Sequence, residues 1–262
     1  MMMFRKSSPQ QRKLKSAILA DSFSDMKWWL EDVENAIQRA TLKIAPAIDD
    51  VARELKVKQN DDLYVVGGFV RDAVLAALTN KDYTSKDLDI ILPNRPNFDE
   101  NPNIVWKKEN SLGGLKIGTR KFSEIDVFQK SATNPQLIVG QFFDFNCNSI
   151  YYSHRIKQIF ASAHFYGFTS NKVIDFLQAY YTENGIEQRY PNSWVVSRAL
   201  KFQIQFKHKY GFETKLSPNI LYLLYEMDKK TEQEMFDYTK IKVKSESMQK
   251  QIINEYKRLK NY

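Results

Sequence analysis

The sequence of 262 residues contains a single cysteine, Cys147, and only three histidines. A lone cysteine cannot form a disulfide within the chain, which excludes the disulfide-stapled secreted classes and favours a reducing compartment. His154, His164 and His208 are too scattered to indicate a histidine metal cluster. No serine–histidine–aspartate or cysteine–histidine arrangement stands out, so covalent catalysis is not expected.

Long apolar runs are also missing. No run approaches the roughly eighteen residues that spanning a bilayer requires. The basic N-terminus, residues 1–6, is not followed by the hydrophobic segment of a secretory signal. We therefore expect a cytoplasmic protein with no membrane partner. The sequence gives no indication of an oligomeric state.

The composition is that of a well-packed globular protein, with 43% hydrophobic and 13% aromatic residues. The formal net charge of +8 suggests a polyanionic partner. Much of the basic excess lies toward the C-terminus, in Arg198, Lys207, Lys209, Lys215, Lys240, Lys242, Lys244, Lys250, Lys257, Arg258 and Lys260.

The most informative segment joins two short motifs. An apolar run ends in Gly67 and Gly68, a helical segment follows, and a second apolar run carries Asp87 and Asp89. Residues two apart on a strand point to the same face, so the two aspartates are expected side by side. Two carboxylates held this close repel each other unless a cation lies between them. Mg²⁺ prefers oxygen ligands and works with phosphates, and it is the expected ion.

The double glycine has its own chemical meaning. Gly67 and Gly68 remove side chains where a phosphate must approach the backbone, and they precede a helix whose N-terminal dipole attracts anions. A phosphate site beside a Mg²⁺ site indicates nucleotide chemistry.

This order of motifs resembles the head domain of class II tRNA nucleotidyltransferases and bacterial poly(A) polymerases, in the DNA polymerase β-like superfamily. The family signature is Gly-Gly-x-x-Arg-Asp, a short helix and Asp-x-Asp, matched here by Gly67, Gly68, Arg71, Asp72, Asp87 and Asp89. The resemblance covers roughly residues 60–208. It implies an α+β fold: a mixed sheet flanked by helices, with an N-terminal helical extension and an all-α C-terminal neck region.

The superfamily also carries a third carboxylate on a later strand. Residues 123–128 alternate polar and apolar, which places Glu124 and Asp126 on the face opposite the apolar positions. We assign the third carboxylate to Asp126, because it lies mid-strand, with Glu124 as the alternative. Residues 112–118 are expected to form the preceding strand of a hairpin.

Two further motifs match the family in part. Asp144, Phe145 and Asn148 fit its Arg-Arg-Asp-Phe-Thr-Ile-Asn-Ala motif, and Arg198, Ala199 and Phe202 fit the start of its neck helix. The resemblance implies that the nucleotide is bound by Gly67, Gly68, Arg71, Asp72, Asp144, Asn148, Asn192, Arg198 and Lys201. Arg71 is expected to contact the nucleotide or brace the site, with Asp72 partly structural.

The chain departs from the family where the family reads the base. There the family has Glu-Asp-x-x-Arg, whose Asp and Arg hydrogen-bond the incoming base. The matching positions here are Pro191, Asn192 and Val195. Asn192 can still bond a base edge, whereas Val195 cannot. Phe142 and Phe143 likewise replace two arginines of the preceding motif.

The patterns predict three regions: a helical N-terminal extension over residues 1–60, a nucleotidyltransferase head over 61–165 and a helical neck or RNA-binding region over 166–262. In the first, residues 1–20 are expected to be loose and 24–55 helical, with Pro46 dividing the helix.

Strands in the head are expected over residues 63–66, 88–92, 104–107, 114–117, 124–128, 150–152 and 156–160, with a helix over 69–78. From about residue 170 the pattern is helical to the end. Ser217 and Pro218 are expected to begin a helix there, as N-cap and first helical residue.

Together these features predict a Mg²⁺-dependent nucleotidyltransferase that moves NMP from NTP, with ATP favoured, to an RNA 3′ end, as in tRNA processing. Asp87 and Asp89 would hold two Mg²⁺ ions, one of them shared with Asp126. RNA is the expected partner of the basic C-terminal region. Two alternatives stay open: a mobile-element or defence-associated transferase that modifies a protein, a small molecule or another nucleotide, and an inactive RNA-binding scaffold.

Overall fold

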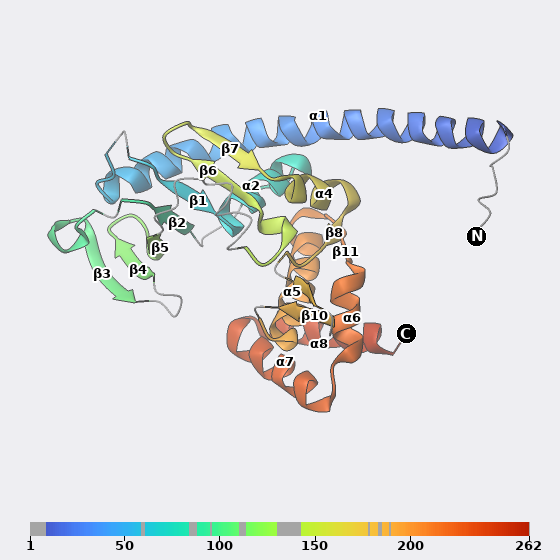
Figure 1. Cartoon of the computed structure of the whole chain (residues 1–262). Coiled ribbons are helices and arrows are strands. Elements are labelled where there is room, and N and C mark those ends of the chain that lie inside the picture. The colour runs from blue at the N-terminus through green and yellow to red at the C-terminus, as the bar shows by residue number, and fades with distance from the viewer. Residues whose placement is uncertain are drawn as a thin grey trace.

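The computed structural model describes residues 9–58, 61–83, 88–94, 96–109, 114–129, 143–177, 179–182, 185–188 and 190–261. Asp87 and Phe142 therefore lie outside the described residues. A mixed sheet with helices on one face is followed by a helical C-terminal region (Figure 1). The long helix α1 runs along the sheet region and extends beyond it at its N-terminal end (Figure 1).

The sheet has seven strands in the order β3-β4-β5-β2-β1-β6-β7. β2 and β5 are parallel neighbours, and the other neighbouring pairs are antiparallel. Every strand predicted for the head is present, with bounds that differ by at most two residues at either end. These bounds are β1 (Tyr64–Val66), β2 (Leu88–Leu92), β3 (Ile104–Glu109), β4 (Leu115–Thr119), β5 (Ile125–Gln129), β6 (Ile150–Ser153) and β7 (Gln158–Ala161).

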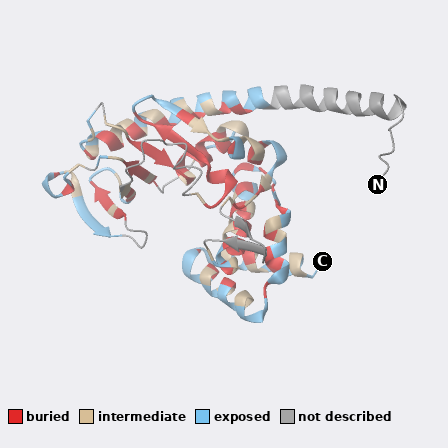
Figure 2. Ribbon diagram, in the orientation of Figure 1, coloured by how far each residue is buried: buried red, intermediate tan, exposed pale blue. Residues whose placement is uncertain are grey.

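The two faces of this sheet have different roles, because alternate residues of a strand point to opposite sides. Val65, Ile90 and Ile125 point into the main apolar core, which α1 and α2 (Gly68–Leu78) complete. The opposite face carries a smaller apolar cluster of Tyr64, Val66, Ile91 and Tyr151. Figure 2 shows the central strands as buried and β3, at one edge, as mostly exposed.

Helix α1 (Pro9–Glu54) corrects two predictions. The chain is helical from Pro9 rather than loose to residue 20, and Pro46 does not divide the helix. A proline inside a helix costs about 3 kcal/mol, whereas burying one large apolar side chain contributes roughly 1.5–3 kcal/mol. Packing therefore outweighs the cost, because α1 buries a whole stripe against the sheet region: Val33, Ala36, Ala40, Ile44, Ile48 and Val51.

The C-terminal region is built from α4 (Ala163–Asn171), α5 (Asn192–Tyr210), α6 (Pro218–Glu226), α7 (Lys229–Lys242) and α8 (Glu246–Lys260). Ser217 caps α6 by accepting a hydrogen bond from the Ile220 amide, which confirms the predicted start of that helix. Two short 3-10 helices, η1 (Phe98–Glu100) and η2 (Asn146–Asn148), lie earlier in the chain.

The chain after residue 170 is not helical throughout, which corrects a further prediction. β8 (Val173–Ile174) pairs in parallel with β11 (Lys215–Leu216), and β9 (Ala179–Thr182) pairs with β10 (Gly185–Gln188). These strands have two to four residues, too few to show a period of two in the sequence. The predicted fold class is nevertheless confirmed, and none of the helices in the described part of the chain has the length and apolar character of a membrane span.

Candidate active site

Two of the predicted carboxylates lie together on the face of the sheet that α1 and α2 do not cover. Asp89 of β2 is the direct partner of Asp126 on the parallel strand β5. Asp89 is half-buried, and the Asp126 side chain is 23% exposed. The register therefore brings together two carboxylates that are 37 positions apart in the sequence.

The double glycine borders this pair. Gly67 has a φ of +68°, which favours glycine, and a Cβ placed there would lie 3.2 Å from Oδ2 of Asp89. Helix α2 begins at the next residue, Gly68. The predicted turn, helix and carboxylate strand are thus assembled with the helix N-terminus beside Asp89, where an anion is stabilised by the helix dipole.

Lys116 is a member of the site that the sequence did not reveal. It is the β4 partner of Asp126, and its Nζ lies 3.1 Å from Oδ2 of Asp126 and also bonds Glu124. Burial acts to lower the pKa of Lys116, but the hydrogen bonds to Glu124 and Asp126 outweigh burial and raise it. The alternation of β4 places Lys116 opposite the buried Ile117, but its partner depends on a strand register that is set in three dimensions.

The oxygen donors of this face fit a hard cation such as Mg²⁺. The contact between the Lys116 ammonium and the Asp126 carboxylate shows that this face attracts positive charge. Within the described ranges, no group of three or more His, Cys, Asp or Glu side chains is placed to hold a metal ion. Asp87, the remaining predicted ligand, lies outside those ranges.

Five other predicted residues form one polar chain between the sheet and α5. Arg71 donates from Nε to Oδ1 of Asp72 at 2.8 Å and from Nη1 to Oδ1 of Asn148 at 2.6 Å. Asn148 donates to Oδ1 of Asp144 at 3.2 Å, and Arg198 lies 2.8 Å from the other oxygen of Asp144. The chain therefore joins α2 and η2 to the first half of α5.

The Arg71 end of this polar chain is buried and well compensated, whereas the Arg198 side chain is 39% exposed. Arg71 and Asp72 are 6% and 5% exposed, and the Arg71 guanidinium lies 4.9 Å from the Phe202 ring centroid. Burial acts to lower the pKa of Arg71, but the charge and hydrogen bond of Asp72 help to outweigh it and raise the pKa. Such packing favours bracing of the site over direct contact between Arg71 and a nucleotide. Cys147 beside them has a pKa raised by burial to about 12, which makes it unsuited as a nucleophile.

The start of α5 holds the three positions at which the sequence departs from the predicted base-reading motif. Pro191 caps the helix, Asn192 is its first residue, and Val195 is buried. Trp194, which the sequence did not single out, is 39% exposed and stacks on Tyr238 with ring centroids 4.8 Å apart. Lys201 lies further along the same helix and is half-buried.

A small cavity at this place is lined by Asp144, Phe145, Phe176, Tyr190, Trp194, Val195 and Arg198. It encloses only about 10 Å³, room for about one water molecule. Aromatic side chains thus fill most of the space at this end of α5, and side-chain movement is needed to admit a ligand there.

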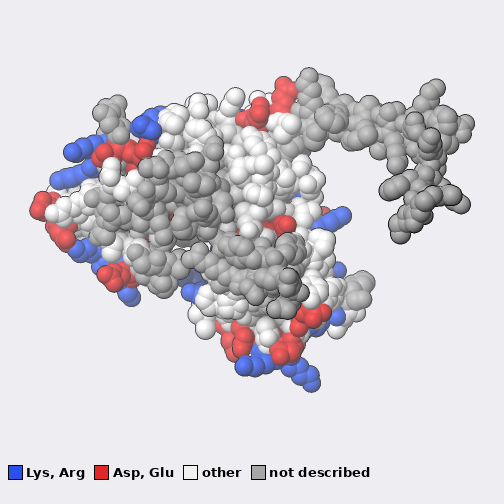
Figure 3. Space-filling model, viewed as in Figure 1, with Lys and Arg blue, Asp and Glu red and all other residues white. Residues whose placement is uncertain are grey.

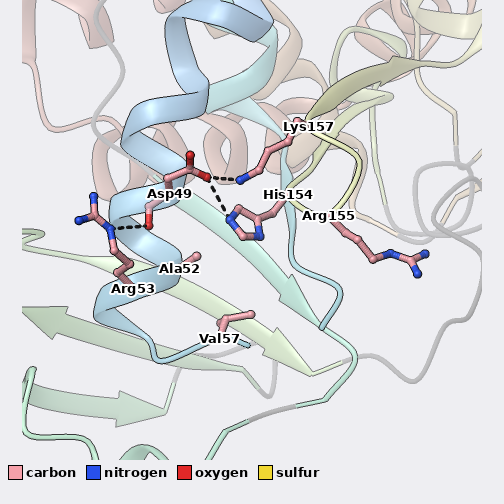
Figure 4. A pocket seen from close by; sticks show the side chains of 7 residues that line it. All are labelled: Asp49, Ala52, Arg53, Val57, His154, Arg155 and Lys157. Atoms are coloured by element: carbon pink, nitrogen blue, oxygen red, sulfur yellow. Dashed lines mark hydrogen bonds and ion pairs between the residues drawn. The ribbon is translucent and has the colours of Figure 1, made fainter. Parts of the chain in front are cut away.

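A second cavity, of about 430 Å³, lies away from the carboxylates, between the C-terminal half of α1 and the turn that joins β6 to β7 (Figure 4). His154 lies 3.1 Å from Asp49, which also pairs with Lys157. Burial lowers the pKa of His154, Lys157 adds to this effect, and Asp49 opposes it. None of the predicted active-site residues lines this cavity.

No protein-family model matches the sequence, and no curated protein matches it. Solved structures do match. A CCA-adding enzyme in its apo form gives a TM-score of 0.53 at 16% identity, covering 82% of this chain and 51% of that one. A CCA-adding enzyme in complex with CTP gives 0.51 at 16% identity, covering 85% and 55%. The Thermotoga maritima CCA-adding enzyme in complex with tRNA gives 0.52 at 15% identity, covering 84% and 54%.

This chain therefore has the fold of the CCA-adding enzymes, which confirms the fold that the sequence motifs predicted. It spans about half the length of the matched chains. At 15–16% identity the likeness concerns the fold.

Proposed function

We propose that the protein is a Mg²⁺-dependent nucleotidyltransferase that transfers NMP from an NTP to the 3′ end of an RNA. The observation that carries this proposal is the direct pairing of Asp89 with Asp126 beside the turn at Gly67 and Gly68. A carboxylate pair next to an anion-binding helix start is the arrangement that a metal-bound triphosphate needs. The match to CCA-adding enzymes in complex with CTP and with tRNA supports the same chemistry.

Each element of the site has a role in this proposal. Asp87, Asp89 and Asp126 would hold two Mg²⁺ ions. When bound, these supply Lewis-acid charge to the triphosphate and the attacking hydroxyl. Gly67 and Gly68 leave space for the phosphates and present backbone N–H groups to them. The polar chain from Arg71 to Arg198 fixes α5 against this site.

RNA is the proposed acceptor because exposed basic side chains gather in the last two helices and the turn between them. Figure 3 shows basic and acidic side chains interspersed on one face of this region, so contact with phosphates would be local rather than through a uniform basic field. The exposed members are Lys240, Lys242, Lys244, Lys250, Lys257 and Arg258. In this proposal residues 61–165 form the catalytic head, residues 166–262 the RNA-binding region and residues 1–60 an extension packed on the head.

One observation favours a second acceptor class. The predicted base-reading positions hold Pro191, Asn192 and Val195. A transferase that modifies a protein, a small molecule or a nucleotide would tolerate this departure. An inactive scaffold is disfavoured, because Asp89 and Asp126 are retained in register.

The experiment that separates these possibilities traces the acceptor. Purified protein is incubated with each NTP labelled at the α-phosphate, Mg²⁺ and total cellular RNA and protein, and portions are then treated with ribonuclease or protease. The proposal expects label that ribonuclease removes and protease does not. Label removed by protease, or found in a small soluble product, would move the acceptor to the second class.

A further inference from the structure

The edge strand β3 exposes a large aromatic side chain next to the catalytic face. Figure 2 shows β3 as mostly exposed at the margin of an otherwise buried sheet. Trp106 in the middle of this strand is 40% exposed, and the neighbouring Val105 is 65% exposed. A tryptophan exposed on an edge strand is a candidate binding residue, because contact with a partner would bury apolar ring surface that is exposed to solvent here.

The strand register places Trp106 on the same face as the carboxylates. Trp106 pairs with Gly118 of β4, and two residues along the same strands Lys108 pairs with Lys116. Lys116 in turn pairs with Asp126, the direct partner of Asp89. Cross-strand partners project to one side of a sheet. Trp106, Lys108, Lys116 and the two aspartates therefore share a face.

Gly118 makes room for the indole. A Cβ at Gly118 would lie 2.0 Å from Nε1 of Trp106 and 2.5 Å from its Cε2. The five-membered ring thus occupies the space over the Gly118 backbone, close to the sheet, while the rest of the ring system keeps its exposure. Any other residue at position 118 would force the indole away from the sheet.

The distance to the carboxylates suits an acceptor strand. Trp106 lies two strands from β5, roughly 10 Å at the usual strand spacing, and two residues, roughly 7 Å, along the strands from the level of Asp126, which together give roughly 12 Å. A base next to the reacting 3′ end of an RNA reaches over such a distance. Bases stack on aromatic rings without sequence preference, while nearby cations contact the phosphates. Lys108 is exposed on the same face as Trp106, and Lys107 of the same strand is also exposed.

We propose that Trp106 is a stacking platform for a base of the RNA acceptor strand, held over Gly118 at the edge of the catalytic face. This inference rests on the proposed transfer to RNA, which it extends by assigning a place to the acceptor. The competing explanation is that Trp106 only covers the sheet edge.

The variants that separate the two explanations are Trp106→Leu and Trp106→Phe. Leucine keeps an apolar cover over Gly118 but removes the aromatic face, whereas phenylalanine keeps a smaller one. Val105→Ala is the matched control, since it trims an exposed apolar side chain of the same strand. Binding of a fluorescein-labelled single-stranded RNA is measured by anisotropy, together with Tm and the KM values for RNA and NTP.

The platform predicts that Trp106→Leu raises the Kd for RNA roughly 5-fold to 100-fold. The KM for RNA is expected to rise with it, while Tm, kcat and the KM for NTP change little. Trp106→Phe should bind between the two, and Val105→Ala should bind as the wild type does. An unchanged Kd and RNA KM in Trp106→Leu would overturn the proposal, as would a loss of RNA binding that follows a fall in Tm.

The two proposals fail in different ways in these measurements. If the wild-type protein transfers no nucleotide but binds RNA through Trp106, the proposed transferase activity is wrong and the proposed stacking role of Trp106 stands. If the wild-type protein transfers nucleotide to RNA and its KM for RNA equals that of Trp106→Leu, the proposed transferase activity stands and the proposed stacking role of Trp106 is wrong.

Discussion

Asp89 and Asp126 lie side by side on the parallel strands β2 and β5, on the face of the sheet opposite the one that α1 and α2 cover. Backbones of neighbouring strands are about 4.8 Å apart, so the two carboxylates repel each other unless positive charge lies close by. Lys116 supplies part of that charge in the structure, through contacts with Asp126 and Glu124. This pairing is the basis for assigning a metal-dependent reaction to this face.

Neutralising one carboxylate is expected to remove activity without loss of stability. Asp89→Asn keeps the shape of the side chain and relieves the repulsion with Asp126, so Tm should stay the same or rise. Nucleotide transfer should fall below detection, because the metal loses a ligand. Asp87→Ala should behave in the same way. Wild-type turnover in Asp89→Asn with Mg²⁺ in excess would contradict the metal assignment.

The third carboxylate can be assigned by comparing two neighbours on β5. Asp126 is opposite Asp89 and 23% exposed, whereas the Glu124 side chain is 54% exposed. Asp126→Ala should therefore reduce kcat by orders of magnitude, and Glu124→Ala by less than tenfold. The measurement is steady-state transfer at saturating NTP. The reverse ranking would show that the ligand lies two residues earlier on the strand.

Removing Arg71 is expected to destabilise the protein strongly. The side chains of Arg71 and Asp72 are 7% and 6% exposed, and breaking a buried pair by removing one partner costs about 3–5 kcal/mol. Arg71→Met should therefore lower the free energy of unfolding in urea by that amount. The additional change Asp72→Asn should recover part of it, because it neutralises a buried carboxylate whose remaining charged partner is the more distant Lys209, 3.6 Å away.

The control for this experiment is an exposed pair. Arg258 contacts Glu255 on α8 with its side chain 55% exposed, so Arg258→Ala should cost less than about 1 kcal/mol. A similarly small cost for Arg71→Met would show that the chain from α2 to α5 does not brace the site.

The sequence predicted the carboxylate face because its determinants are local. The alternation of side chains along a strand determines which residues share a face, and Gly67 and Gly68 indicate a turn whatever the position of the strand in the sheet. The pairing of Asp89 with Asp126, by contrast, needs the register between β2 and β5. The sequence motifs supplied that relationship only through the resemblance to a family with three carboxylates.

The remaining features depend on tertiary packing. Local propensity predicts a break at Pro46, and the buried stripe of α1 overrides that preference. Lys116 and Trp106 share the face of Asp89 and Asp126 only through the pairings of β4 with β5 and β3. The role of Trp194 depends on its stacking against Tyr238 of α7, a contact between distant segments of the chain. None of these contacts leaves a periodic signal in the chain.

Base selection is expected to be loose. Asn192 is the one polar side chain among the three substituted base-reading positions, while Val195 is buried. Strong rejection of a wrong base requires buried polar groups that the wrong base leaves unpaired. We therefore expect one nucleotide type or a short irregular tail, with ATP the favoured donor. Sequencing of RNA 3′ ends after reaction with all four NTPs measures this, and faithful addition of C-C-A to a truncated tRNA would contradict it.

The central claim, nucleotidyl transfer at the Asp89 and Asp126 face, is tested most directly by following the two ends of the triphosphate. RNA is incubated with the protein, Mg²⁺ and ATP labelled at either the α- or the γ-phosphate, with EDTA and Asp126→Ala as controls. The account predicts that α-label enters RNA, that γ-label does not, and that both controls abolish incorporation. Incorporation of γ-label, or α-label that persists in EDTA or in Asp126→Ala, would contradict it.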